Sequence, residues 1–314
     1  LGQCTIPDGI GTAPDFTYHD SCRAQNKCEK GGGSMNAKTQ DKIAKVFLWF
    51  IGFLLIAILA AFLGYMLYKG LPVLSPKFIF GMPSDTEAGG GVGPQLFNTI
   101  YILFLSMAFS IFIALGAAIY LSEYAKDTAL TRFIRLSTES LATVPSIVLG
   151  LFGMIVFVDF LGMGFSILGG ALSLSLLNLP LLVRVTEEAL QTVPQTYREA
   201  SLALGATKWQ TIRKVVLPEA MGGIITGIML ASGRAIGESA ILIFTAGTTV
   251  SRHMADFDVF AGGETLAVHL WYVMGIGLVP DRVAIANGIG ALLILVVLFI
   301  NLLFIFAQRK LKSV

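Results

Sequence analysis

The sequence predicts an all-α, polytopic membrane protein with about six transmembrane helices. Of its 314 residues, 55% are hydrophobic and 13% are charged, whereas soluble domains carry about 25% charged residues. Apolar runs of twenty or more residues recur along the chain, and about 20 apolar residues suffice for one helix to cross a bilayer. The formal net charge of +2 indicates little about partners, and we expect no nucleic-acid partner.

Residues 1–34 differ in composition from the rest of the chain. This stretch is polar, ends in a linker of Gly and Ser, and holds all three cysteines, Cys4, Cys22 and Cys28. We interpret it as a tag, a linker or a misannotated leader and exclude it from the fold prediction. A small disulfide or metal module is the alternative, which the odd cysteine count and the lack of a matching histidine pair disfavour. Residues 35–314 form the predicted transmembrane domain.

Six segments of this domain are long and apolar enough to span the membrane. They are residues 45–68, 96–121, 137–160, 166–187, 219–246 and 284–307. Pro145 lies inside the third segment. Asn178 and Pro180 are expected to break the fourth, because proline lacks the amide hydrogen that a helix interior needs. Within residues 247–283, the stretch "ETLAVHLWYVMGIG" predicts a re-entrant or interfacial helix.

Lysine and arginine predict the orientation of these spans, since they concentrate in cytoplasmic loops. With the N-terminus in the cytosol, the segments on that side hold thirteen basic residues: Lys38, Lys42, Lys45, Lys126, Arg132, Arg135, Arg198, Lys208, Arg213, Lys214, Arg309, Lys310 and Lys312. The opposite segments hold four: Lys69, Lys77, Arg252 and Arg282. This bias predicts that both termini and the polar segment 188–218 face the cytosol.

The polar segment 188–218, which we call the elbow, predicts two short helices joined by a turn. Pro194 suits an early position of the first helix, and Gly205 can end it by adopting a positive φ. Thr207 is placed to cap the second helix, which Pro218 is expected to close before the fifth span opens. From spacing alone, two interpretations stay open: an amphipathic hairpin on the inner leaflet, or a docking surface for a cytosolic protein.

Three charged residues fall inside predicted spans. Arg234 and Glu238 are four residues apart, so a continuous fifth helix would place them on one face, and Arg184 lies near the inner end of the fourth span. Burying arginine costs ~2.5–3.5 kcal/mol, and its planar fork suits an oxyanion. The carboxylate can accept a hydrogen bond from an oxyanion that keeps a proton. The alternatives are an ion pair that only joins helices and, for Arg184, snorkelling to the cytosolic surface.

No motif for catalysis or metal binding is present in the sequence. The G-x-x-x-x-G-K-[ST] phosphate loop of many ATPases is absent, and "GGGVG" at 89–93 predicts a flexible loop. Two histidines and three acidic residues lie in the segment 247–283, with a spacing that fits no metal-site pattern: His253, His269, Asp256, Asp258 and Glu264. We therefore expect no enzymatic activity, no metal and no cofactor in this chain.

The elbow resembles the cytoplasmic signature loop of bacterial ABC-importer permeases. In "EASLALGATKWQTIRKVVLP", the Glu-Ala start, a Gly six residues after the Glu and a final Leu-Pro match that loop, with Ser201 in place of its second Ala. The resemblance implies a type I ABC-importer permease fold, in which this loop forms coupling helices that dock on an ATPase subunit. It assigns the coupling role to Arg198, Glu199, Ala200, Gly205, Ala206, Leu217 and Pro218.

Three further stretches are similar to the phosphate-specific permeases of this class. They are "GPQLFNTIYILFLSMAFSIFIALGAAIYLSEYA" at 93–125, "LATVPSIVLGLFG" at 141–153 and "GRAIGESAILIFTAG" at 233–247. The last resembles the PstA type more than its sister PstC. The resemblance implies that Arg234, Glu238 and Arg184 line a path for phosphate across the bacterial inner membrane.

The same resemblance implies the partners of the chain. They are a homologous PstC-like permease, two PstB-like subunits that bind ATP and Mg²⁺, a PstS-like extracytoplasmic phosphate-binding protein, and the membrane lipid. The alternatives are a permease for another oxyanion such as molybdate or sulfate, an ion-coupled secondary transporter and a non-transporting sensor subunit. The signature loop disfavours the secondary transporter, because that class needs no ATPase.

Overall fold

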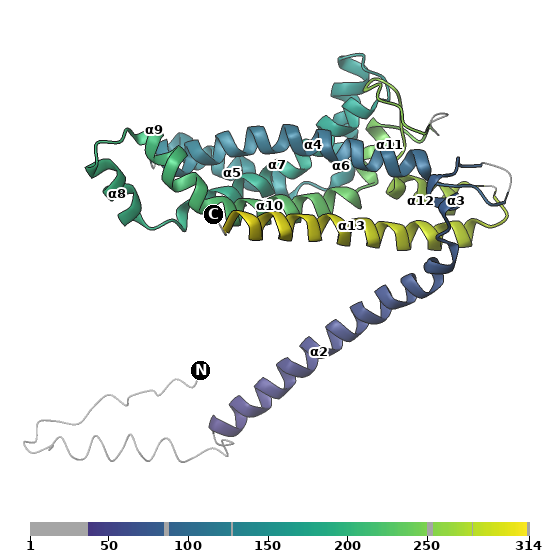
Figure 1. Ribbon diagram of the computed structural model, residues 1–314, viewed down its shortest axis with the longest axis horizontal. Helices are drawn as coiled ribbons and strands as arrows, with labels where there is room; N and C mark the ends of the chain where they lie inside the picture. Colours follow the sequence, from purple (N-terminus) through teal and green to yellow (C-terminus); the bar gives the residue numbers. More distant parts are fainter. Residues whose placement is uncertain (1–36, 85–87, 127, 250–253, 278, 313–314) are drawn as a thin grey trace, which may run out of the picture. The chain divides into compact units, whose positions relative to one another are not determined.

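The computed structural model describes residues 37–84, 88–126, 128–249, 254–277 and 279–312. Within these ranges every regular element is a helix (Figure 1), which confirms the predicted all-α class. The chain divides into two units, residues 1–62 and 63–314, and each is described by itself. The interpretation of residues 1–34 as a tag, linker or leader lies outside the described residues.

Helix α2 (Ala37–Gly70) supplies the described part of the first unit. Its sequence is apolar on all sides, and large side chains such as Trp49, Phe53 and Phe62 are exposed. A helix that is hydrophobic all round and is not covered by protein is suited to lipid. The predicted first span, 45–68, is therefore confirmed as one long apolar helix.

Five helices of the described chain are long and apolar enough to cross a membrane, and a bent pair makes a sixth. The five are Asp41–Val73, Gly93–Tyr124, Ile167–Gln191, Lys208–Ile236 and Arg282–Lys310. The pair joins α5 (Ala129–Thr143) to the helical segment Ser146–Phe160 at an angle of 101°. Pro145 lies at the bend. Proline disfavours helical backbone at the residue before it, which accounts for the interruption of the helix there. The predicted third span, 137–160, is thus no single straight helix.

The second unit is a bundle whose central helix is α7 (Ile167–Gln191). It packs against α4 (Gly93–Ile119) and against α10 (Leu217–Ile236), and α13 (Arg282–Lys312) runs along α10 (Figure 1). Most of the inward side of α7 is buried, including Leu174 and Leu182. The α6 (Ser146–Gly153) and α11 (Ala240–Thr245) helices pack together beside it. Some of these helices adjoin π-helical turns. These are η2 (Tyr120–Tyr124) after α4, η3 (Met154–Phe160) after α6 and η4 (Ile212–Val216) before α10.

Pro180 lies inside α7, which stays helical from Ile167 to Gln191. The predicted break at Asn178 and Pro180 is therefore wrong. Both residues are buried where neighbouring helices pack around α7, so tertiary packing outweighs the local cost of proline. The side chain of Asn178 has no hydrogen-bond partner in the described chain.

Two glycines of α10 let it approach α7 closely. A Cβ atom on Gly223 would lie 2.6 Å from Ala189 Cβ, and one on Gly227 would lie 2.8 Å from Val185 Cγ1. Small residues at such contacts are what allow helices to pack closely in a membrane. The pairings also show that α7 and α10 run antiparallel, since residue numbers rise on one helix as they fall on the other.

We expect Gly223→Ala to destabilise the folded chain by about 1–3 kcal/mol, because the added methyl group overpacks the contact with Ala189. Gly233→Ala is the matched control: it lies on the same helix, and no atom lies within 4 Å of its added Cβ. Thermal unfolding in detergent measures both. Equal melting temperatures of the two variants would contradict the close approach of the helices.

Buried polar residues join α4 to α12 (Leu266–Gly275) at the end of the second unit that lies opposite the elbow (Figure 1). Gln95 Nε2 donates to Glu264 Oε1 at 2.7 Å, and His269 Nδ1 lies 2.7 Å from the same oxygen. The backbone amide of Leu266 donates to Thr99 Oγ1 at 2.9 Å. Within the described ranges no three potential metal ligands come together, while His253 lies outside those ranges.

Candidate coupling elbow and translocation path

The elbow folds as two short helices joined at a glycine, as the sequence predicts. Helix α8 (Gln195–Ala203) follows Pro194, and Gly205 adopts a φ of +83°. The Gly205 amide donates to the Leu202 carbonyl at 2.9 Å. Only glycine adopts this left-handed backbone without a steric cost, so the turn depends on this residue.

The second helix of the elbow, α9 (Lys208–Thr211), begins at the predicted cap. Thr207 Oγ1 accepts from the Gln210 amide at 3.3 Å, and Gln210 Oε1 accepts from the Thr207 amide at 2.9 Å. This reciprocal pair is a capping box. Ser201 and Thr211 hydroxyls, 2.9 Å apart, join the two helices.

The predicted boundary at Pro218 is wrong, because the chain stays helical from Lys208 to Ile236. The π-turn η4 lies just before the proline, and the Leu217 amide donates to the Ile212 carbonyl five residues earlier. The wider turn accommodates a residue that has no amide hydrogen. Leu217 is half-buried and Pro218 exposed, both within the helix that continues as α10.

The signature residues of the elbow divide into an outward and an inward set. Glu199, Ala200 and Gly205 are exposed, and Ala206 is half-buried. Beside them Leu204 is 89% exposed and Trp209 54% exposed, which gives the elbow an apolar tip. Such exposed apolar side chains are typical of a docking surface.

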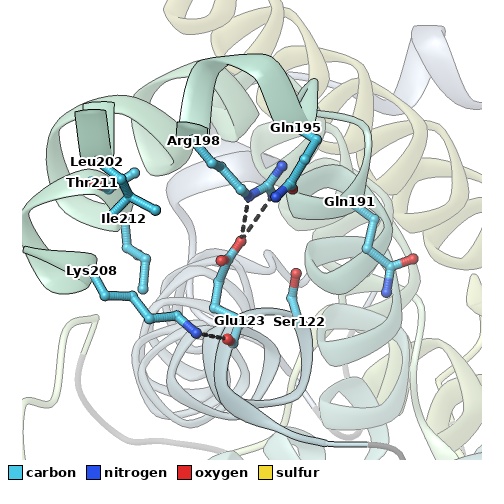
Figure 2. A pocket seen from close by; sticks show the side chains of 9 residues that line it. All are labelled: Ser122, Glu123, Gln191, Gln195, Arg198, Leu202, Lys208, Thr211 and Ile212. Carbon is cyan, nitrogen blue, oxygen red and sulfur yellow. Dashed lines mark hydrogen bonds and ion pairs between the residues drawn. The ribbon is translucent and has the colours of Figure 1, made fainter. Parts of the chain in front are cut away.

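Arg198 belongs to the inward set, since its side chain is only 13% exposed. Its Nε and Nη2 atoms donate to Glu123 Oε1 at 3.1 and 2.9 Å (Figure 2). Nη2 also donates to the Leu190 carbonyl at 2.8 Å, and Nη1 to the Val193 carbonyl at 2.5 Å. Arg198 therefore holds the elbow together internally, and Glu123 is a functional candidate that the sequence analysis missed.

Arg234 lies in the last turn of α10 and is exposed. Its side chain forms no ion pair or hydrogen bond with any residue that the structure describes. Gly237 ends the helix, so Glu238 lies in the link between α10 and α11. The prediction that Arg234 and Glu238 share one helix face is therefore wrong, and they do not form the ion pair that was the alternative.

Glu238 caps the start of α11 from within the link. Its Oε1 accepts from the Ile241 amide at 3.5 Å, and the side chain is half-buried. The predicted fifth span, 219–246, thus consists of two helices with a break between them. A break in a membrane helix exposes backbone groups and is tolerated where it is buried in protein or lines a cavity.

Arg184 lies on α7, where its Nε donates to Glu188 Oε1 at 3.1 Å; both side chains are largely exposed. Both residues line a pocket of about 220 Å³ together with Arg135 and Glu187, which pair at 2.6 Å. Because Gly227 faces Val185, Arg184 lies some six residues nearer the elbow than Arg234, or about 9 Å along the helix. The structure therefore places the two arginines at different depths.

The long apolar helices, the polar elbow and the break in the fifth span are features of a polytopic membrane protein. The chain belongs to the family of binding-protein-dependent transport system inner membrane components, whose model matches residues 111–313. It is thus a multi-pass inner-membrane protein and the permease component of an ABC transporter.

The relatives of this chain include permeases of ABC transporters and of phosphate transport systems. A probable ABC transporter permease, YqgI of Bacillus subtilis, is 44% identical over 85% of this chain and 95% of its own length. The PstA phosphate permease of Xylella fastidiosa is 36% identical over 58% of this chain and 63% of its own length. A probable PstA of Methanocaldococcus jannaschii is 36% identical over 65% of this chain and 72% of its own length.

Solved structures share the fold. The MetNI methionine ABC transporter matches with a TM-score of 0.58 and 22% identity over 69% of this chain and 94% of its own. A bacterial alginate ABC transporter matches with a TM-score of 0.59 and 13% identity over 94% of this chain and 98% of its own. These likenesses confirm the predicted type I ABC-importer permease fold.

Proposed function

We propose that this chain is a PstA-type permease subunit that forms half of the phosphate path in an ATP-driven importer. The observation that carries the proposal is Arg234, an exposed arginine without a partner among the described residues, next to the break between α10 and α11. A charge of this kind in a membrane helix marks a substrate pathway more often than a structural contact. Two relatives named as phosphate permeases support the choice of anion.

The chemistry of the Arg234 and Glu238 side chains suits phosphate. Arginine stays protonated and presents two parallel N–H donors to an oxyanion. Phosphate near neutral pH keeps at least one P–OH, which can donate to the carboxylate of Glu238. Sulfate has no such proton. Arg184, nearer the elbow, would receive the anion next.

The partners follow from this function. The exposed elbow residues would dock on one of two PstB-like ATPase subunits, which carry ATP and Mg²⁺, while the chain itself catalyses nothing. A PstC-like permease would complete the path, and a PstS-like protein would deliver phosphate from outside. Both termini would lie in the cytosol, as the distribution of basic residues indicates.

Transport by the purified complex tests the proposal. The untagged chain is co-purified with its partner subunits and reconstituted into vesicles. Labelled phosphate, sulfate and molybdate are then offered separately with ATP and the binding protein. We expect uptake of phosphate alone. Preferred uptake of sulfate or molybdate would assign the chain to another oxyanion, and uptake without ATP would indicate a secondary transporter.

We expect Glu238→Gln to weaken discrimination against sulfate by about tenfold, since a hydrogen bond to a charged group is worth about 1.5–3 kcal/mol. Glutamine keeps an oxygen that can accept from Ile241, so the start of α11 should persist. Glu219→Gln, at the other end of α10, is the matched control. Competition between labelled phosphate and sulfate measures the effect. Unchanged competition would remove Glu238 from the proposed path.

A further inference from the structure

We propose that Glu123 and Arg198 form a positioning pair that makes the elbow move together with α4. The inference rests on the proposed function only in that the elbow receives motion from an ATPase. Glu123 lies in η2, the π-turn that continues α4, and is 75 residues from Arg198 in sequence. The pair is thus a long-range contact between the elbow and a membrane helix.

Glu123 contacts both helices of the elbow. Its carboxylate accepts two hydrogen bonds from Arg198 on α8, and its backbone carbonyl accepts one from Lys208 Nζ on α9 (Figure 2). The same Lys208 ammonium lies 4.7 Å from the centre of the Tyr124 ring, where a cation is attracted by the ring face. The end of α4 is therefore attached to α8 and α9 at once.

Arg198 adds the end of α7 to this connection. The Leu190 and Val193 carbonyls that it binds belong to the last turn of α7 and the link that follows it. Carbonyls at a helix C-terminus lack partners within the helix and favour a cation. A planar guanidinium has five N–H donors and makes all four of these hydrogen bonds at once, whereas an ammonium group has only three donors.

The ion pair of Arg198 and Glu123 is largely shielded from water, so removing either charge should weaken the attachment of the elbow. The Arg198 and Glu123 side chains are 13% and 9% exposed. Beneath the elbow lies an apolar cluster from α4, α7, the elbow and α10: Ala118, Ala189, Leu190, Val193, Val216, Ala220 and Ile224. Removing one charge here leaves the other partly buried without its counterion, which costs more than losing a fully exposed pair.

The space around the pair explains why a polar connection is needed. A pocket of about 470 Å³ lies between the elbow and the end of α4, lined by residues that include Ser122, Gln191 and Gln195. The elbow is therefore not packed solidly on α4, and the bonds of Glu123 cross the gap (Figure 2). Without them, the elbow would be attached mainly through its own chain ends and the cluster below.

The first experiment measures the attachment in the full chain without any partner. Cys4, Cys22 and Cys28 are replaced by serine, and a spin label is placed at the exposed position 204. Glu123→Gln should increase the mobility of the label, and Arg198→Lys should do so as well. Asp41→Asn, which breaks an exposed 2.8 Å ion pair in α2, is the control and should leave the label unchanged. Unchanged mobility in both elbow variants would overturn the proposal.

The second experiment measures ATP hydrolysed per phosphate imported by the reconstituted complex, a ratio that a purely structural defect would not change. We expect Glu123→Gln to raise it on the order of fivefold, within the range of coupling between distant sites. The double variant with Arg198→Lys should be no worse than the poorer single one. A mobile elbow with a normal ratio would also overturn the proposal. If the wild-type complex imported no phosphate, the proposed function would fail, and label mobility alone would decide whether the pair holds the elbow.

Discussion

Replacing Arg234 with lysine is expected to reduce phosphate uptake by about tenfold to a hundredfold. Lysine keeps the positive charge but not the two-pronged fork, and a hydrogen bond to a charged group contributes about 1.5–3 kcal/mol. Because Arg234 has no described partner within the chain, the change breaks no contact on which the described fold depends. Uptake of labelled phosphate into vesicles measures it, with assembly of the complex checked in parallel.

Arg282→Lys provides the matched control for this substitution. Arg282 is exposed at the first position of α13, away from the break between α10 and α11. Its substitution should leave uptake unchanged. Wild-type uptake by the Arg234→Lys variant would show that the anion does not need the guanidinium, and the path assignment of Arg234 would have to be withdrawn.

Gly205→Val is expected to abolish most ATP-driven uptake while membrane insertion stays normal. The φ of +83° costs an ordinary L-residue about 1–2 kcal/mol and a β-branched residue more. No atom lies within 4 Å of an added Cβ, so the strain comes from the backbone alone. The turn between α8 and α9 would relax, and the apolar tip at Leu204 would lose its position. Uptake and ATPase activity of the same complex measure the effect.

Gly205→Asn separates backbone strain from side-chain size. Asparagine tolerates the left-handed region better than most residues, and the open space around position 205 accommodates its amide. This variant should keep most of the uptake. If valine and asparagine were equally harmful, the positive φ would not be the reason, and if both were harmless the turn would have no part in coupling.

The sequence predicts those parts of the molecule that depend on local chemistry. Gly205 needs a positive φ and Thr207 needs a capping partner three residues on, and both requirements can be recognised from neighbouring residues alone. The long spans likewise follow from apolar composition. The phosphate specificity, the partners and the roles of Arg184, Arg234 and Glu238 stay predictions.

The predictions that failed depended on packing or on small backbone irregularities. The backbone at Pro180 stays helical because α4 and α10 pack around α7. Pro218 is accommodated by a π-turn, and no sequence pattern predicts such a turn. Glu238 lies outside α10 because Gly237 ends that helix. Glu123 could not be recognised, since its partner lies 75 residues away; its position at the end of an apolar run was the only signal.

The buried contacts of Gln95 give α4 the mechanics of a lever. Its 27 residues make a rod about 40 Å long, held at Gln95 by the buried Glu264 and attached at its other end to the elbow through Glu123. If its elbow end were displaced by about 4 Å, such a rod would tilt by about 6° and its midpoint would move by about 2 Å. Near that midpoint Ser110 donates to the Ser175 carbonyl of α7 at 3.3 Å. A displacement at the elbow end of α4 would thus be about halved at the middle of the helix, where it contacts α7.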